Sequence, residues 1–170
     1  MSEVKHYKVG DKLVEFGQVF RIFKIENKTD SEGQPIRILH FRPYYKSPEN
    51  KGMICSIPEN SIGQTNIREP MSRDDAKMIM KKLSEALDDQ IATDIDTVKQ
   101  ALGENDPHTT VRILRSLWME KVTSETFSKS KKDMFELSTS RLVEELALVI
   151  DITPEKTDSK IRAALEKLAA

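Results

Sequence analysis

The chain has 170 residues, of which 38% are hydrophobic and 32% charged, with a formal net charge of -1. This length suits one ordinary domain or two small ones, and the apolar content excludes a chain that is disordered throughout. The charge excludes a protein that coats nucleic acid by bulk electrostatics, because counterion release requires clustered Lys and Arg. No apolar run is long enough for a membrane span and no signal-peptide pattern is present, so we expect a cytoplasmic protein.

The N-terminal part of the chain, residues 7–67, has the pattern of short β-strands. Apolar residues alternate with polar ones over residues 13–25, which predicts strands. Residues 26–35 combine Asn, Asp, Ser and Gly, which are typical of a hairpin loop, and residues 36–41 are expected to return antiparallel. With a further strand at residues 53–57, the pattern predicts a small antiparallel barrel of the SH3 or Tudor kind.

The pattern becomes helical after Pro70. Ser72 followed three residues later by Asp75 is a variant capping box and predicts a helix start. We expect that helix to end near Leu87. Apolar spacing, caps, and the Gly and Pro positions predict four further helices, at residues 91–102, 107–122 and 128–150 and from Thr153-Pro154 to the end of the chain.

The two longest predicted helices are expected to share one core. Their apolar residues recur three and four positions apart, as packed amphipathic helices require. These residues are Val111, Leu114, Leu117 and Trp118 in one segment and Met134, Leu137, Leu142, Leu146 and Ile150 in the other. The predicted fold class is therefore α+β, with an SH3/Tudor-like barrel in residues 1–70 and an all-α bundle of about five helices in residues 71–170.

The residues that carry catalytic or metal chemistry do not form a recognisable motif. HExxH, CxxC, GxSxG and glycine-rich phosphate loops are all missing from the sequence, and the three histidines fall on separate predicted elements. The single cysteine, Cys55, lies in an apolar stretch and is expected to be a core thiol. We therefore predict a protein that is not an enzyme and needs no cofactor or metal.

Two stretches are better candidates for binding. Lys129, Lys131 and Lys132 stand at a predicted helix start, where backbone N–H groups and the helix dipole favour phosphate. A solvated helix end is the alternative interpretation. Arg42 lies next to Phe41 and close to two tyrosines, a composition enriched at protein interfaces. Core packing at the rim of the barrel explains those aromatic residues equally well.

Four strings in this order resemble the CarD/CdnL family of bacterial transcription regulators: YKVGD at 7–11, IPEN at 57–60, VRILRSLW at 111–118 and LVEELAL at 142–148. The resemblance covers nearly the whole chain. It implies a Tudor-like domain that docks on the β subunit of RNA polymerase and a helical domain that contacts promoter DNA. Transcription-repair coupling factors share the first domain, but this chain has no helicase motifs.

The resemblance also implies particular residues on the polymerase side. The family has basic residues in the first hairpin and in the strand before the proline, and these positions correspond to Lys28 and Ser56. One of the two charges is therefore replaced by a hydroxyl. Arg37 and Arg42, in the strand after the hairpin, complete the predicted polymerase-binding set.

On the DNA side, the family's tryptophan wedge, which lies at the edge of the melting promoter, corresponds to Ile91. The basic positions that follow it fall on Thr93, Asp94 and Asp96, where carboxylates would repel phosphate. An aliphatic wedge is conceivable, because such side chains also part base steps. The later DNA-contacting lysine corresponds to Lys132, and Trp118 matches a helix-packing position. The predicted DNA-binding set is therefore Ile91, Lys129, Lys131 and Lys132.

Two functions follow from these patterns. The first is a non-enzymatic transcription regulator that binds RNA polymerase β through the barrel and promoter DNA, even if weakly, through the helices, so that it modulates the open complex. The alternative is a protein–protein adaptor, on RNA polymerase or another partner, in which the acidic Asp94 and Asp96 have turned the helical domain away from DNA. We expect a monomer in either case.

Overall fold

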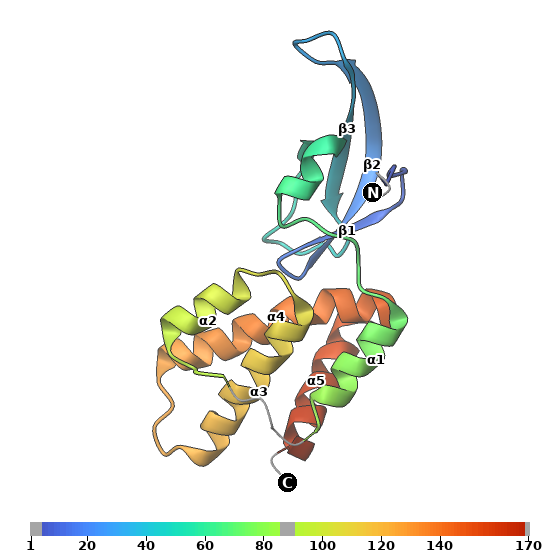
Figure 1. Cartoon of the computed structure of the whole chain (residues 1–170). Helices are drawn as coiled ribbons and strands as arrows, with labels where there is room; N and C mark the ends of the chain where they lie inside the picture. Colours follow the sequence, from blue (N-terminus) through green and yellow to red (C-terminus); the bar gives the residue numbers. More distant parts are fainter. Residues whose placement is uncertain (1–4, 86–90, 169–170) are drawn as a thin grey trace. The chain divides into compact units, whose positions relative to one another are not determined.

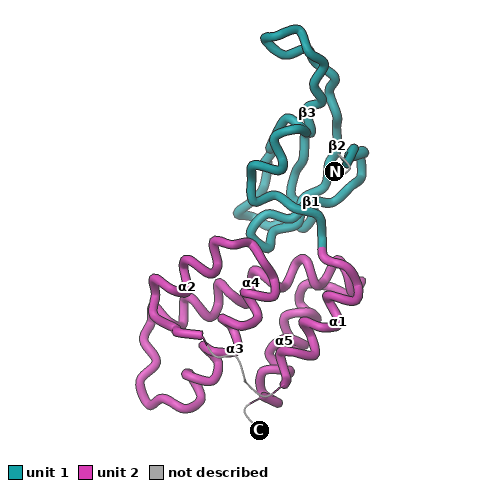
Figure 2. Tube along the Cα trace, in the orientation of Figure 1, with its two compact units in different colours: residues 1–70 teal, residues 71–170 magenta. Residues whose placement is uncertain are grey.

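The fold is taken from a computed structural model, and residues 5–85 and 91–168 are the ones described. It has an antiparallel sheet followed by helices, which confirms the α+β class. The chain divides into two compact units, residues 1–70 and 71–170 (Figure 2). In the described ranges, every helix is too short or too polar to cross a membrane.

The first unit contains four strands in the order β1-β2-β3-β4, and every neighbouring pair is antiparallel (Figure 1). A short 3₁₀ helix, η1, follows them. The bounds are β1 Lys12–Glu15, β2 Gln18–Thr29, β3 Pro35–Pro43, β4 Cys55–Pro58 and η1 Glu59–Gln64.

The alternating stretch at residues 13–25, which the sequence predicts to be β-structure, spans two separate strands. A tight turn at Phe16 and Gly17 separates β1 from β2, and both residues have positive φ, 49° and 79°. Two consecutive positive φ values are typical of the hairpin turn whose twist matches that of its strands.

The hairpin loop predicted at residues 26–35 is wrong in extent, because β2 and β3 stay paired out to Thr29 and Pro35. The true loop is residues 30–34. Asp30 organises it, since its Oδ1 accepts the N–H groups of Glu32 and Gln34 at 2.9 and 2.8 Å. Polar composition indicated a loop here, but ladder hydrogen bonds keep these exposed residues in strands.

One face of the sheet carries the core of the first unit. Leu13, Ile22 and Leu39 are fully buried, and Phe20 meets Phe41 edge-to-face with ring centroids 5.4 Å apart. Alternation along the strands places these side chains on one face. Cys55 packs against this cluster but is only partly buried, so the expected core thiol lies at its margin.

The second unit contains five α-helices among its described residues: α1 Arg73–Lys82, α2 Ile95–Leu102, α3 Pro107–Thr123, α4 Lys129–Ile150 and α5 Pro154–Leu168. The predicted caps at the starts of α1 and α3 are confirmed. Ser72 accepts from Asp75 N at 3.1 Å, and Asp106 accepts from His108 N at 3.1 Å. Ser128 caps α4 in the same way, accepting from Lys131 N at 3.2 Å.

Two predicted helix bounds differ from the structure. The helix expected from Ile91 begins at Ile95, because Asp94 caps it by accepting from Thr97 N at 3.0 Å. An N-cap residue is not helical, so Ile91 lies in the preceding segment. The first helix ends at Lys82, and its predicted end at Leu87 lies outside the described residues.

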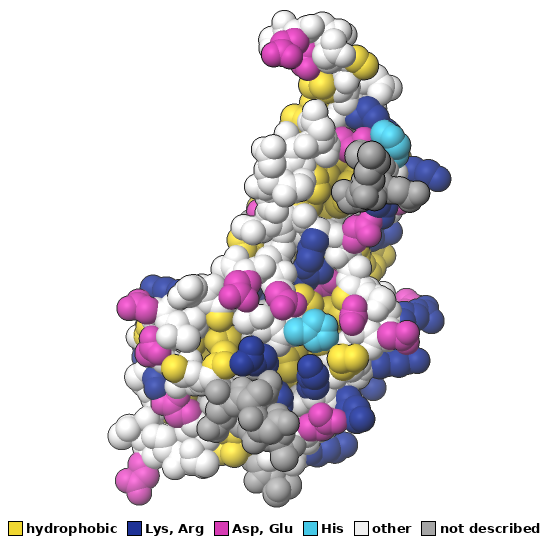
Figure 3. Space-filling model, viewed as in Figure 1, with side chains coloured by type: hydrophobic (Ala, Val, Ile, Leu, Met, Phe, Trp, Pro, Cys, Tyr) yellow, Lys and Arg dark blue, Asp and Glu magenta, His cyan; other side chains and the backbone are white. Residues whose placement is uncertain are grey.

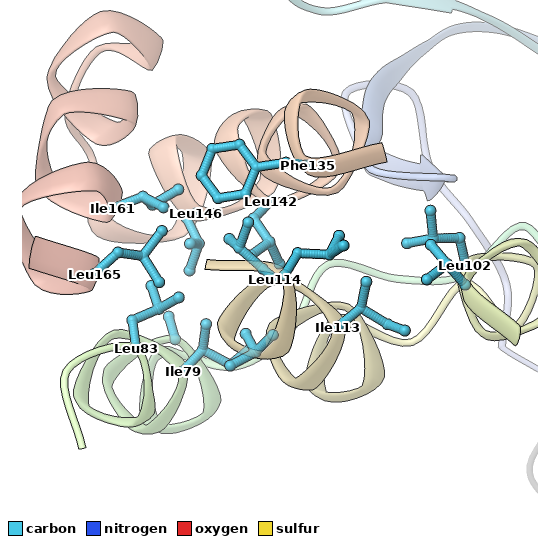
Figure 4. Close-up of a cluster of buried hydrophobic side chains, with 14 residues drawn as sticks. Ile79, Leu83, Leu102, Ile113, Leu114, Phe135, Leu142, Leu146, Ile161 and Leu165 are labelled. Atoms are coloured by element: carbon cyan, nitrogen blue, oxygen red, sulfur yellow. The ribbon is translucent and has the colours of Figure 1, made fainter. Parts of the chain in front are cut away.

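Side chains from α1, α3, α4 and α5 converge on one core, in which Leu114, Leu142 and Leu146 point toward one another (Figure 4). The sequence placed Leu137 on the buried apolar face of α4, and this prediction is wrong because Leu137 is 36% exposed. Phe135, which is only 2% exposed, is the buried residue in that turn. The buried row also includes Ser138 and Thr139. These hydroxyls donate to the carbonyls one turn earlier, at 2.7 and 2.9 Å, which satisfies them without water.

Three charged residues of α3 and α4 hold backbone groups of other segments. Glu145, which is 1% exposed, accepts the N–H of Met71 at 2.7 Å. Arg115, which is 3% exposed, donates to the Glu85 carbonyl at 3.0 Å, and Arg141 donates to the Leu102 carbonyl at 2.6 Å. These charge-assisted hydrogen bonds tie the backbone before α1, after α1 and at the end of α2 to the long helices.

Candidate functional site

The two faces of the sheet differ in character because side chains alternate along each strand. In β3, Leu39 and Phe41 enter the core, so His40 and Arg42 are on the opposite face. Strand register extends that face to neighbouring strands, since Arg42 pairs with Arg21 on β2 and His40 pairs with Ser56 on β4.

Register puts five cations on this face. Lys12, opposite Arg21, is partly buried, and the other four, Arg21, Lys24, Lys28 and Arg42, form what we call the basic sheet face. All four are exposed. In the four strands, which lie wholly within the described residues, Glu26 is the one carboxylate on this face. Sequence reasoning found Lys28 and Arg42 and missed Arg21 and Lys24, because only the register shows that these residues share a face.

The cations of the basic sheet face are unequally compensated. Lys24 and Lys28 both approach Glu26, with Nζ–Oε distances of 3.3 and 3.4 Å, and their hydrogen bonds hold the pKa of Glu26 below its ordinary value. Arg21 and Arg42 form no ion pair within residues 5–85 and 91–168, and they lie directly opposite each other. Like charges in that position are unfavourable. Arg42 stacks 4.8 Å from the Phe23 ring centroid.

Ser56 and His40 extend this face to the edge strand. Ser56 Oγ lies 2.7 Å from His40 Nδ1, and His40 Nε2 lies 2.9 Å from Glu26 Oε1. The face therefore continues as connected polar side chains from β2 to β4. Such a surface can bind an acidic partner through charge-assisted hydrogen bonds.

Arg37 is separate from this surface. It shares the core-side face with Leu39, where it donates to the Tyr7 carbonyl at 2.6 Å and lies 3.7 Å from Glu59. Of the four residues predicted to bind polymerase, the sheet brings Lys28, Arg42 and Ser56 to one face and places Arg37 on the other. Arg37 holds the N-terminal segment against the sheet.

The second candidate surface surrounds Glu120, near the end of α3. Its carboxylate accepts hydrogen bonds from Lys131 in α4 and from Thr93, in the segment before α2. Burial raises the pKa of Glu120, but the hydrogen bonds from Lys131 and Thr93 outweigh burial and hold it below its ordinary value. We call these three residues the Glu120 cluster.

Asp94 lies beside the Glu120 cluster. Its hydrogen bonds with Thr97 hold its pKa below the ordinary value, and the charge of Lys131 adds to the effect. The fold thus brings the Thr93–Asp94 segment next to the start of α4. Glu120 pairs with Lys131 here and Asp94 adds a second negative charge, which together leave less positive charge for phosphate.

The four predicted DNA-binding residues differ in how exposed they are and in whether their charge is already paired. Ile91 is partly buried against the helical core, and its N–H donates to Ser116 Oγ at 3.3 Å. Lys129 and Lys132 are exposed in the first turn of α4. Lys131 is engaged by Glu120. The structure therefore leaves two exposed cations at this helix start.

Trp118 has the packing role that the sequence predicts, although it is only partly buried. Its ring lies 5.9 Å from that of Phe135, and Lys121 Nζ lies 5.4 Å from its centroid. These contacts place it at the edge of the helical core. Within residues 5–85 and 91–168, no group of three or more His, Cys, Asp and Glu side chains could hold a metal ion.

Comparison with protein-family models gives no match to this chain. Comparison with curated proteins also gives no match.

Proposed function

We propose that the chain is a cytoplasmic, non-enzymatic regulator of transcription that resembles the CarD/CdnL proteins. Its first unit binds the β subunit of RNA polymerase and its second unit contacts promoter DNA, which alters the stability of the open complex. The four strings that resemble this family support the proposal. The chain order, a small antiparallel sheet followed by helices, is also the order that the resemblance implies.

The proposal includes a finer description of the fold, a sheet curved into a Tudor-like barrel and two separate domains at residues 1–70 and 71–170. A β-bridge supports the curvature, since Val14 and Arg68 exchange N–H to O hydrogen bonds of 2.8 and 2.9 Å. This bridge brings the end of the unit back to β1. The β-bulge between Ile22 and Lys24 supports it too, because bulges increase twist.

The observation that carries the polymerase part of the proposal is the basic sheet face. Arg21 and Arg42 oppose each other without a carboxylate partner among the described residues, so an acidic surface would relieve their repulsion. Electrostatic complementarity of this kind sets association rate and specificity. The same face includes Lys28 and Ser56, the positions that the family resemblance selects.

The test measures binding of the full chain to purified RNA polymerase β subunit by biolayer interferometry. Lys28→Glu with Arg42→Glu is expected to weaken binding about tenfold or more, because each charge reversal replaces attraction by repulsion. Lys99→Glu, a single charge reversal on α2 of the other unit, is the control and should leave affinity unchanged. Wild-type chain that does not bind, or a double variant that binds normally, overturns this part.

The DNA part rests on Lys129 and Lys132, which are exposed at the N-terminus of α4. Each phosphate contact contributes about 0.9 to the slope of log affinity against log salt. Replacing both lysines by Ala should therefore weaken binding to promoter duplex and lower the slope by about 2. Lys99→Ala controls for a general change in charge, and an unaltered slope in the double variant rejects the phosphate role.

A specific observation favours the adaptor as the second candidate. Glu120 neutralises Lys131, and Asp94 and Asp96 are exposed at the start of α2. This charge pattern suits a protein partner better than phosphate. Polymerase binding without any shift of promoter DNA at low salt selects the adaptor, whereas a salt-dependent shift selects the DNA-binding regulator.

A further inference from the structure

A groove of about 380 Å³ lies on the second unit, where α1 meets the C-terminal end of α4 and α5. Ala76 and Met80 on α1, with Val149 and Ile150 on α4, form its apolar lining. These residues pack in or against the helical core, so the groove is an opening in that core's outer layer. Its volume lies within the range of protein binding pockets.

Cations border this apolar strip on both sides. Arg73 and Lys77 come from α1 and Lys160 comes from α5, and all three are exposed. Arg73 and Lys77 are four residues apart and therefore share one face of α1. Figure 3 shows Lys and Arg side chains on the α1 side of the second unit, with hydrophobic and acidic side chains among them.

These charges are uncompensated in the described part of the chain. No Asp or Glu is among the described residues that line the groove. Within residues 5–85 and 91–168, Arg73, Lys77 and Lys160 form no ion pair. A concave apolar surface bordered by one sign of charge focuses a positive potential on whatever enters it.

We propose that this groove binds an acidic amphipathic helix of a partner protein. Apolar side chains of that helix, three and four residues apart, pack on Met80, Val149 and Ile150, and its flanking carboxylates pair with the cations on either side. Helix-in-groove recognition has this division of roles. Met80 suits it, because methionine adapts its shape to different apolar partners.

Charge complementarity selects this occupant over nucleic acid. A phosphate backbone offers anions but nothing to pack on an apolar floor, and burial of that floor supplies the favourable hydrophobic term. An acidic amphipathic helix supplies both apolar and anionic groups. The three cations stand on two different helices, so a partner with carboxylates on both sides of its apolar stripe pairs with all of them.

The groove is distinct from the proposed DNA-contacting surface. Lys131 and Val149 stand at opposite ends of α4, and at 1.5 Å per residue they are about 27 Å apart along the helix. Charge changes at one end are therefore screened from the other at physiological salt. The groove and the lysines at the start of α4 can be tested separately in one protein.

The experiment titrates the ¹⁵N- and methyl-labelled full chain with two synthetic amphipathic peptides of about sixteen residues, long enough to form helix. Both carry Leu three and four residues apart, and their flanking positions are all Glu in one and all Lys in the other. We expect the Glu peptide to shift signals of Met80, Val149 and Ile150 and the Lys peptide to bind about tenfold more weakly or not at all.

Charge reversal gives the decisive comparison. Arg73→Glu with Lys77→Glu should weaken the Glu peptide about tenfold or more and strengthen the Lys peptide. Lys129→Glu with Lys132→Glu, the same charge change at the other end of α4, should alter neither. Circular dichroism verifies that both variants fold.

Three outcomes overturn the proposal: no shifts with the Glu peptide at millimolar concentration, shifts located away from the groove, or equal binding of both peptides. A wild-type chain that binds the Glu peptide but not promoter DNA rejects the DNA part of the proposed function alone. Loss of peptide binding in the groove variant, with polymerase binding intact, supports the groove as an independent site.

Discussion

Replacing Glu120 by Gln tests how the segment before α2 is held to the start of α4. Both side chains of the Glu120–Lys131 pair are 26% exposed, so the ion pair contributes at most about 1 kcal/mol. The hydrogen bond from Thr93 is worth about 1 kcal/mol, of which Gln retains part. Without the carboxylate, Lys131 remains unpaired in the first turn of α4, where the helix dipole disfavours a cation by about 0.3–1 kcal/mol. We expect Glu120→Gln to lower the free energy of unfolding by about 1–2 kcal/mol at neutral pH.

The pH dependence of this loss has a definite sign. Burial raises the pKa of Glu120, but hydrogen bonds from Lys131 and Thr93 bring it below the ordinary value of 4.5. The stabilisation is therefore complete above that ordinary value and is lost as pH falls through the lower pKa of the folded state. Urea unfolding followed by helical circular dichroism should show a constant gap between wild type and variant near neutral pH, which closes as the pH is lowered below 4.5.

A double-mutant cycle isolates the ion pair. Lys131→Met should cost less stability in the Glu120→Gln background than in the wild-type chain, because the interaction is already absent there. A stability gap that stays constant across this pH range would falsify the assignment of the stabilisation to the Glu120 charge. If Lys131→Met costs the same stability in both backgrounds, Glu120 and Lys131 do not stabilise the fold as a pair.

Three further predictions concern packing, capping and thiol reactivity. Leu142→Ala should lower the free energy of unfolding by about 2–5 kcal/mol in urea titrations, because Leu142 is fully buried in the helical core; a cost below about 1 kcal/mol contradicts that packing. Ser128→Ala should cost about 1 kcal/mol through loss of the α4 cap, whereas Ser130→Ala in the same turn should cost less, and equal losses would show that the cap contributes nothing. Burial raises the pKa of the Cys55 thiol, so its alkylation at mildly alkaline pH should be slower in the folded chain than in urea, and equal rates would refute the shielding.

Most helix starts and the α+β class can be predicted from the amino-acid sequence alone. Ser72, Asp106 and Ser128 mark helix starts, because a capping side chain bonds to N–H groups only two or three residues away. The apolar periods of α3 and α4 similarly predicted a shared core. At Leu137 and Phe135 the period alone was not enough, because buried Ser138 and Thr139 satisfy their hydroxyls locally and so belong to the inward face.

Which residues from distant parts of the chain come into contact depends on the folded structure. Register places Arg21 opposite Arg42 and sends Arg37 to the other face, although the sequence grouped Arg37 with Lys28. Packing of α3 against α4 turns Lys131 toward Glu120, and α1 with α5 gathers three cations around an apolar groove. Capping residues and apolar periodicity predict the conformation of a few neighbouring residues. Contacts between residues far apart in the chain depend on strand register and helix packing, which the fold as a whole sets.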